Sequence, residues 1–251
     1  MADVFTAERL DMKLDRGRWA FADQRRAEID AYFAERQRAQ PAIWNGRVLM
    51  IGRYALSNGV LGGRWFETDY ASMLAWKAWE AWEAWKTSDA TWGAAWGAPD
   101  ATVRNGFALG ALRSSDGAFL LGVMGAHTAN AGMIYFPAGT PDPGDVVGDR
   151  VDLAGSVLRE LEEETGIAAA DVDIAPGWHV VDAGPPRLAL IQLLRAREDA
   201  AALRERILRH LAAEAEPELA DIRIVRCEAD LDPMMPDFVT IFLRRHWRTD
   251  R

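Results

Sequence analysis

The pattern of apolar and polar residues predicts alternating strands and helices in the second half of the chain. Residues 104–125 contain two apolar runs joined by a turn signal at residues 114–117, so we expect a hairpin there. Apolar runs of strand length also occur at residues 133–136, 172–181, 187–194 and 222–227. Helices are expected at residues 200–213, where aliphatic residues recur at helical spacing, and at residues 237–247. This alternation predicts an α/β fold in which a mixed sheet packs between helices.

The first hundred residues have a different pattern, which predicts helices before strands. The large apolar residues of the segment 6–40 are spaced for helices, and Pro41 ends that helical stretch. Two strands are expected after it, at residues 47–56 and 64–68. A turn-forming cluster at residues 97–100 then marks a change in sequence character. We therefore predict an N-terminal α+β accessory lobe at residues 1–100 and a second domain at residues 101–251.

A tryptophan repeat dominates the end of the predicted lobe. The rings lie three residues apart at first and more widely later, at Trp76, Trp79, Trp82, Trp85, Trp92 and Trp96. A period of three slips by about 60° per repeat against a helix, so these rings wrap around the helix rather than form one stripe. Exposed rings would stack on a base or contact a second subunit. The alternative, which we favour, is a low-complexity helix whose rings pack on the second domain.

Charge and cysteine content narrow the functional classes. The formal net charge of −9 over 251 residues argues against a broad attraction to nucleic acid or to membranes. Cys227 is the only cysteine, so no internal disulfide can form and we expect a reducing compartment. Charged residues break the longest apolar runs, and neither a signal peptide nor a spanning segment is expected. The sequence thus predicts a cytoplasmic protein that binds neither nucleic acid nor membranes.

Residues 153–165 predict an acidic helix with recognisable ends. Asp152 offers an N-cap carboxylate, and Gly166 offers the left-handed residue that commonly closes a helix. Three carboxylates share one face of this helix, those of Glu160, Glu163 and Glu164. Glutamate runs are most often solvated helix faces. Three carboxylates on one face repel one another unless a cation lies between them, and hard oxygen ligands favour magnesium, manganese or calcium over zinc.

The sequence of residues 159–167, RELEEETGI, resembles the second half of the Nudix box, R-E-U-x-E-E-x-G-U with U an aliphatic residue. The chain therefore resembles the Nudix hydrolase family over about residues 101–251, which implies an α/β/α sandwich with a mixed sheet. By this resemblance, the metal ligands are Glu160, Glu163 and Glu164, and the metal is Mg²⁺ or Mn²⁺. Glu163, Glu164 and Arg159 are the expected catalytic residues. The family's arginine orients a box carboxylate, and the i, i+4 spacing of Arg159 and Glu163 permits that pairing.

The first half of the box departs from the family pattern, in which Gly-x5-Glu-x7 precedes the arginine. Counting back from Arg159 places Asp145 at the glycine position and Val151 at the glutamate position. Neither residue type fits. The departure predicts either a shifted alignment or a weakened metal site.

An alternative alignment begins at residues 136–139, FPAG, which resemble the strand end and turn that open the box. It makes the loop of residues 140–151 six residues longer than in the family, with the composition of a turn-rich surface loop. The missing glutamate is then replaced by Asp149, by Asp152 or by no residue. Asp152 is equally expected to serve only as a helix cap.

The resemblance implies hydrolysis of a nucleoside diphosphate linked to another moiety, by a metal-activated water. Nucleotide-sugars are the favoured substrates, because residues 41–70 faintly resemble the lead-in of Nudix enzymes that hydrolyse UDP-sugars; dinucleotide cofactors and coenzyme A follow. The candidates for the general base are Glu164, Glu228 and Asp230. The candidates for substrate contacts are Gly139, His127, Asn130 and Asp152.

Two other functions stay open. The altered first half of the box would suit a catalytically weak or inactive Nudix fold that binds a nucleotide as a sensor. The tryptophan-rich half would suit an interaction or dimerisation module. The expected partner is a small-molecule nucleotide substrate, with a homodimer as a further possibility.

Overall fold

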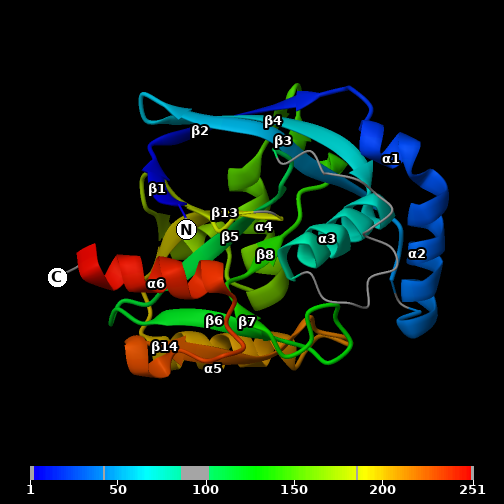
Figure 1. The fold of residues 1–251 in the computed structure, drawn as a ribbon. Helices are drawn as coiled ribbons and strands as arrows, with labels where there is room; N and C mark the ends of the chain where they lie inside the picture. Colours follow the sequence, from blue (N-terminus) through cyan, green and yellow to red (C-terminus); the bar gives the residue numbers. More distant parts are fainter. Residues whose placement is uncertain (1–2, 42, 86–101, 185, 250–251) are drawn as a thin grey trace.

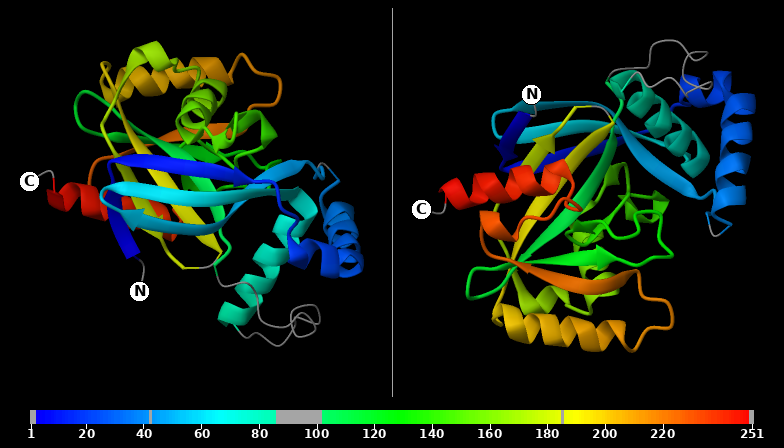
Figure 2. Two further views of the ribbon diagram at one scale, coloured as in Figure 1. Left: turned by 90° about the horizontal axis from the view of Figure 1, so that it is seen from above. Right: turned by 60° about the horizontal axis from the view of Figure 1, so that its bottom comes forward.

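A computed structural model describes residues 3–41, 43–85, 102–184 and 186–249, with only the backbone of residues 79–85. The chain builds two sheets with helices around them (Figure 1). The two sheets pack over one another, and helices α1, α2 and α3 lie together at one end of the smaller sheet (Figure 2). No helix within the described residues is long and apolar enough to span a membrane.

The larger sheet has nine strands in a mixed arrangement. Its main path runs β1-β12-β13-β5-β6-β14, with β11 beside β13, β7 beside β6 and β8 beside β5. The strands are β1 (Asp3–Ala7), β5 (Asn105–Arg113), β6 (Phe119–Met124), β7 (Ile134–Tyr135), β8 (Ala138–Gly139), β11 (Val172–Ile174), β12 (Trp178–Asp182), β13 (Arg187–Ala196) and β14 (Leu219–Val225). Among the described strands of this sheet, β5 and β13 pair in parallel and the other pairs are antiparallel. The predicted α/β class and mixed sheet are confirmed.

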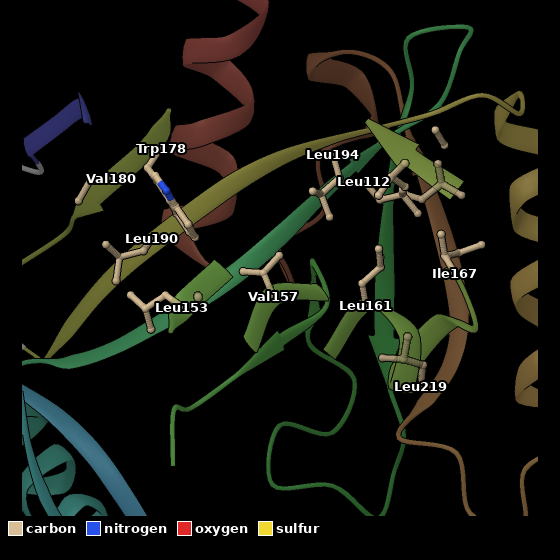
Figure 3. Close-up of a cluster of buried hydrophobic side chains, with 14 of the residues drawn as sticks. Leu112, Leu153, Val157, Leu161, Ile167, Trp178, Val180, Leu190, Leu194 and Leu219 are labelled. Atoms are coloured by element: carbon tan, nitrogen blue, oxygen red, sulfur yellow. The ribbon is translucent and has the colours of Figure 1, made fainter. Parts of the chain in front are cut away.

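Helices cover both faces of the larger sheet, because alternate strand residues are apolar on each face. Helices α4 (Leu153–Thr165) and α5 (Ala200–Leu211) share one hydrophobic core with the sheet. Figure 3 shows this core, in which Leu153, Val157 and Leu161 of α4 point toward the strands. Helix α6 (Asp237–Thr249) packs on the other core through Phe238, Phe242 and neighbouring apolar residues. This arrangement is the predicted α/β/α sandwich.

The predicted hairpin at residues 104–125 is open rather than closed. Strands β5 and β6 share only the pair Arg113↔Phe119 next to the turn. Beyond this pair, β5 and β6 diverge and leave a fork between them. The segment of β7 and β8 lies in this fork, where β7 pairs with β6 and β8 pairs with β5. The prediction missed this fork because the turn signal specifies only the closed end of a hairpin. The fork brings Ala138 and Gly139 into the middle of the sheet.

The smaller sheet, ordered β3-β4-β2-β10-β9, belongs mostly to the first hundred residues. Its strands β3 (Arg47–Ser57) and β4 (Val60–Asp69) confirm two predicted strands. The helical prediction for residues 6–40 is wrong at its start, where β2 (Arg9–Asp15) forms, since Leu10, Met12 and Leu14 alternate with charged residues. The helices α1 (Ala20–Gln24) and α2 (Arg26–Ala39) follow β2.

The two halves of the chain are joined by strand pairing. Strand β1 pairs with β12 in the larger sheet, from Asp3↔Asp182 to Ala7↔Trp178. In return, β10 (Arg150–Val151) of the second half pairs with β2 and with β9 (Val146–Val147) in the smaller sheet. The predicted boundary between residues 100 and 101 lies outside the described residues and stays a prediction. The pairing of β1 shows that the larger sheet draws on both sides of that boundary.

Helix α3 (Tyr70–Trp85) contains the first part of the tryptophan repeat. Two side chains accept hydrogen bonds from backbone N–H groups at the start of this helix. Asn45 accepts from Ala71 at 2.8 Å, and Asp69 accepts from Ser72 at 2.8 Å. Trp76 is 1% exposed and packs in a core with Ile29 and Phe33 of the N-terminal region, not on the second domain as predicted. The side chains of the later tryptophans, from Trp79 onward, lie outside the described residues, and their role stays a prediction.

Candidate active site

Helix α4 has the bounds and caps that the sequence predicts. The carboxylate of Asp152 accepts the N–H of Gly155 at 3.0 Å, which makes Asp152 the N-cap. Gly166 closes the helix with a φ of 68°, a left-handed conformation that glycine adopts without strain. Leu153, Val157 and Leu161 face the core, so the adjacent face of the helix is left for the carboxylates.

Glu164 is the most buried of the three carboxylates, with 7% of its surface exposed. Its Oε1 accepts the backbone N–H of Ala138 in β8 at 3.2 Å, while its Oε2 is buried without a hydrogen-bond partner. Burial raises the pKa of Glu164 to about 8, although the Ala138 hydrogen bond opposes the rise. A buried carboxylate oxygen without a partner is costly, so this atom is suited to coordinating a cation or to accepting a proton.

Glu160 lies against Gly139, the other residue of β8. A Cβ atom at Gly139 would lie 2.1 Å from Glu160 Oε1, so only glycine leaves room for this carboxylate. Burial raises the pKa of Glu160, and the nearby charge of Arg159 lowers it. Gly139, predicted as a substrate contact, thus leaves the space that the Glu160 carboxylate occupies.

Arg159 connects the carboxylates around α4. Its guanidinium lies 3.2 Å from Glu163 Oε2, 2.9 Å from Glu160 Oε1 and 2.9 Å from Asp145 Oδ1. The predicted pairing of Arg159 with Glu163 is therefore confirmed. The pKa of Arg159 is raised by these three acidic partners, against the effect of its burial. Arg159 stays charged and holds two glutamates of the box in place.

Asp145 pairs with Arg159 in the structure, whereas the sequence offered Asp149, Asp152 or no residue as the replacement for the missing glutamate. The side chain of Asp145 is 4% exposed and accepts the N–H of Asp142 at 3.0 Å. Asp149 is exposed in a turn, and Asp152 caps the helix. The signal was present: counting forward from Gly139 leaves five residues before Asp145, the family's Gly-x5-Glu spacing with aspartate for glutamate. Counting back from Arg159 missed it.

The six additional residues, 146–151, form a small hairpin after Asp145. Strands β9 and β10 join through Gly148, whose φ is 67°. The hairpin extends the smaller sheet, because the N–H of Leu14 donates to the carbonyl of Asp149 at 2.9 Å and Arg150 pairs with Asp11. The expected surface loop is therefore a structured connection between the box and the N-terminal region. Val151 is buried in the core at 5% exposure and takes no part in the carboxylate cluster.

Four other predicted residues lie in different surroundings. His127 is exposed in the loop before β7, whereas Asn130 donates to the Tyr135 hydroxyl at 3.0 Å and lines a cavity beside β8. Glu228 pairs with Arg244 at 2.8 Å, and Asp230 accepts the N–H groups of the residues after β14. No contact among the described residues brings Glu228 or Asp230 to the carboxylates of α4. Their role as a base stays a prediction.

The cavity beside β8 has a volume of about 150 Å³. Ala138 and Gly139 form part of its wall, and the same two residues contact Glu164 and Glu160. The sequence prediction named Gly139 and Asn130 from this wall but missed Lys77, Asn105 and Arg187, which come from distant parts of the chain. A larger cavity of about 710 Å³ on the smaller sheet has no residue of the box in its lining.

The carboxylates on α4 are of the donor type that a hard divalent cation prefers, but in this structure the guanidinium of Arg159 lies among them. Within the described part of the chain, no group of three or more His, Cys, Asp or Glu side chains is gathered tightly enough to hold a metal ion. The unpaired Oε2 of Glu164, the partly buried Glu160 and the space left by Gly139 nevertheless suit oxygen coordination. Glu163, with 61% of its side chain exposed, is the donor most able to turn toward a cation.

No family model and no curated protein matches the chain. Similar solved structures include the Nudix hydrolase RenU from M. smegmatis, with 17% identity, 59% of this chain and 86% of that chain covered, and a TM-score of 0.40. A mutT/nudix family protein from Listeria innocua has 17% identity, with 58% of this chain and 94% of that chain covered, and a TM-score of 0.41.

The NUDIX domain of Shewanella oneidensis NrtR, complexed with ADP ribose, has 16% identity, covers 65% of this chain and 99% of that chain, and has a TM-score of 0.39. At such scores the likeness is remote, so the chemistry must be inferred from the residues of the site. These structures are all Nudix proteins, the family that the sequence of residues 159–167 resembles.

Proposed function

We propose that this protein is a metal-dependent hydrolase that cleaves the diphosphate bond of a nucleoside diphosphate linked to another moiety. The observation that carries the proposal is Glu164, a buried carboxylate with one unpaired oxygen, held by the backbone of β8 next to a cavity. Buried polar atoms without a hydrogen-bond partner are rare in folded proteins, and titratable groups with a strongly shifted pKa cluster at functional sites. The helix sequence and its caps supply the remaining parts of the box around it.

Glu160, Glu163 and Glu164 would hold the cation, Mg²⁺ or Mn²⁺. When bound, such a cation would neutralise charge on the diphosphate and lower the pKa of the water that attacks phosphorus. Arg159 keeps Glu160 and Glu163 near this position and is itself anchored by the buried Asp145. Aspartate in place of the family's glutamate therefore keeps the anchoring function.

Glu164 is the favoured general base. Of the three candidates, it alone contacts the wall of the cavity, through Ala138, while Glu228 and Asp230 are engaged with other partners. Its Oε2 has no hydrogen-bond partner among the described residues, so this oxygen is available to accept a proton. The proton leaving the attacking water would be taken up at this oxygen.

Nucleotide-sugars stay the favoured substrates, followed by dinucleotide cofactors and coenzyme A. The segment that motivated this preference, residues 41–70, forms β3 and β4 and also supports the start of helix α3: Asn45 accepts the N–H of Ala71, and Gly46 accepts that of Tyr70. Its contribution to substrate choice would therefore be indirect, through the position of α3.

A panel of nucleoside diphosphate conjugates tests the proposal. UDP-glucose, ADP-ribose, NADH and coenzyme A would each be incubated with Mg²⁺, with Mn²⁺ and with chelator, and the phosphomonoester products measured. Glu163→Gln should abolish cleavage, whereas Glu162→Gln, at an exposed position of the same helix, should leave it unchanged. Cleavage that persists in chelator, or in Glu163→Gln, would refute the metal-dependent site.

A nucleotide sensor without catalysis is the second candidate. The observation in its favour is that Arg159 occupies the space among Asp145, Glu160 and Glu163, which would weaken binding of a cation. A sensor would show a rise in melting temperature with a nucleotide in the presence of chelator and no product with any cation.

Two further expectations remain predictions. One is a homodimer formed through the tryptophan-rich region, and the other is a cytoplasmic location, based on the single Cys227.

A further inference from the structure

The cavity beside β8 has a polar wall built by two paired strands. Asn105 of β5 lies directly opposite Arg187 of β13 in the parallel ladder, so the two side chains stand on the same face of the sheet. Two residues further along β5, Phe107 returns to that face. All three residues line the cavity. The strand register thus places an amide, a guanidinium and a ring side by side.

The amide of Asn105 is unpaired. The side chain is 5% exposed, its Oδ1 is buried without a hydrogen-bond partner, and its Nδ2 donates to no acceptor among the described residues. Buried amides in folded proteins almost always form hydrogen bonds, so this one is costly to the folded state. A ligand in the cavity that bears a hydroxyl or ring N–H group would satisfy it.

Two cations face the same cavity. Lys77 reaches it from helix α3, and no carboxylate is among the described residues of its lining. Lys77 and Arg187 line the same cavity, and burial together with the charge of Arg187 lowers the pKa of Lys77. Arg187 has an acidic neighbour, Asp237, at 3.5 Å; Lys77 has no ion pair within the described part of the chain. Like charges held together at a cavity suit an anionic ligand.

Aromatic rings form part of the remaining wall. Phe107 and Phe238 meet edge to face at 5.0 Å between ring centroids, and Arg187 lies over the Phe238 ring at 5.8 Å. Tyr135 lines the cavity on the side of β7. A flat ring would find apolar contact here, with hydrogen bonding at Asn105.

We propose that this cavity binds one half of the substrate, a ring bearing hydroxyl or N–H groups, with Asn105 bonding the ring and Lys77 and Arg187 contacting its phosphate. The proposal rests on the proposed function, because the cavity borders the carboxylates of α4 through Ala138 and Gly139. The ring is either the sugar or the base of a nucleoside diphosphate–sugar, since both carry donors that suit an amide. Lys77 makes the N-terminal region part of the binding site.

Calorimetric titration in the presence of chelator tests this proposal without requiring turnover. The probes are UDP-glucose, UMP and glucose 1-phosphate, and the variants are Asn105→Leu and Lys77→Gln, with Lys13→Gln on the smaller sheet as control. Lys77→Gln should weaken UDP-glucose and the monophosphate of the half bound here by about tenfold. Lys13→Gln should weaken neither, because Lys77 lines this cavity and Lys13 does not. Asn105→Leu should weaken UDP-glucose by about tenfold, together with whichever of UMP or glucose 1-phosphate carries the ring bound here.

The stability of Asn105→Leu separates recognition from a structural role. Since the amide forms no side-chain hydrogen bond with the residues that the structure describes, the melting temperature of Asn105→Leu should not fall. A lower melting temperature with unchanged affinity for every probe would overturn the proposal, as would equal affinities for wild type and Lys77→Gln. Binding without hydrolysis would refute only the proposed function, whereas hydrolysis with an unchanged KM in Asn105→Leu would refute only this inference.

Discussion

The two sides of the short strand β8 differ sharply in charge. On one side, Ala138 and Gly139 contact the carboxylates of Glu164 and Glu160; on the other, they border a cavity whose charged residues are Lys77 and Arg187. Acidic groups suit a metal ion and cationic groups suit phosphate oxygens, so a diphosphate beside β8 would meet both. Gly139 belongs to both sides, since it lies against Glu160 and also lines the cavity. The difference teaches that the proposed metal site and the proposed phosphate contacts lie next to each other across one short strand.

The largest expected effect is the loss of the acidic side. Glu164→Gln keeps an acceptor for the Ala138 N–H but removes the negative charge, so kcat should fall by about 10²–10⁴-fold. The melting temperature should be kept, because the buried oxygen without a partner is replaced by a neutral amide. Steady-state kinetics and thermal unfolding check this together, with Glu162→Gln as control. A variant that retains wild-type kcat would remove Glu164 from the site.

Gly139→Ala would disturb both sides at once. Its Cβ would lie 2.1 Å from Glu160 Oε1, so Glu160 must move, and a shift of about 1 Å near the chemistry can reduce turnover by about 100-fold. Gly17→Ala is a matched control, because no atom lies within 4 Å of a Cβ built there. Unchanged kcat in Gly139→Ala would show that Glu160 does not need its present position.

Asp145→Asn tests which residue anchors the arginine. The loss of a charged hydrogen bond to Arg159 should lower the free energy of unfolding by about 1–2 kcal/mol and also reduce kcat, since Arg159 positions two glutamates. Asp149→Asn, in the exposed hairpin turn, should change neither quantity. Urea unfolding and kinetics of the two variants provide the measurement. An effect of Asp149→Asn that exceeds that of Asp145→Asn would contradict the assignment.

The smallest effect is expected at the hairpin that joins the box to the N-terminal region. Arg150→Ala removes a half-exposed ion pair with Asp11, so the free energy of unfolding should fall by only about 0.2–1 kcal/mol, and less at high salt. The backbone hydrogen bond from Leu14 to Asp149 remains. Urea unfolding at low and high salt measures the difference. A loss that is large and insensitive to salt would mean that Arg150 acts through packing.

The sequence predicted best what is local. The bounds and caps of α4, and the pairing of Arg159 with Glu163, follow from residues within one or two helical turns. Strand β2 was missed because helical spacing of Trp19, Ile29 and Phe33 further along dominated the interpretation of the whole segment. Asp145 was missed because an insertion between it and Arg159 shifts any count made from the helix.

The cavity residues could not be predicted, for a different reason. Asn105 and Arg187 lie opposite each other through a parallel pairing of strands far apart in sequence, a register that no local pattern specifies. Lys77 reaches the same place from a helix of the other half of the chain. Local patterns identified the acidic chemistry, while the cationic cavity depends on tertiary structure.

Phosphorus NMR of UDP-glucose incubated with the protein and Mg²⁺ tests the central claim most directly. The account predicts that the two diphosphate signals are replaced by two phosphomonoester signals, and that neither Glu164→Gln nor wild type in chelator produces this change. Diphosphate signals that persist for wild type with every conjugate of the panel would contradict the claim that the carboxylates of α4 form a hydrolytic site.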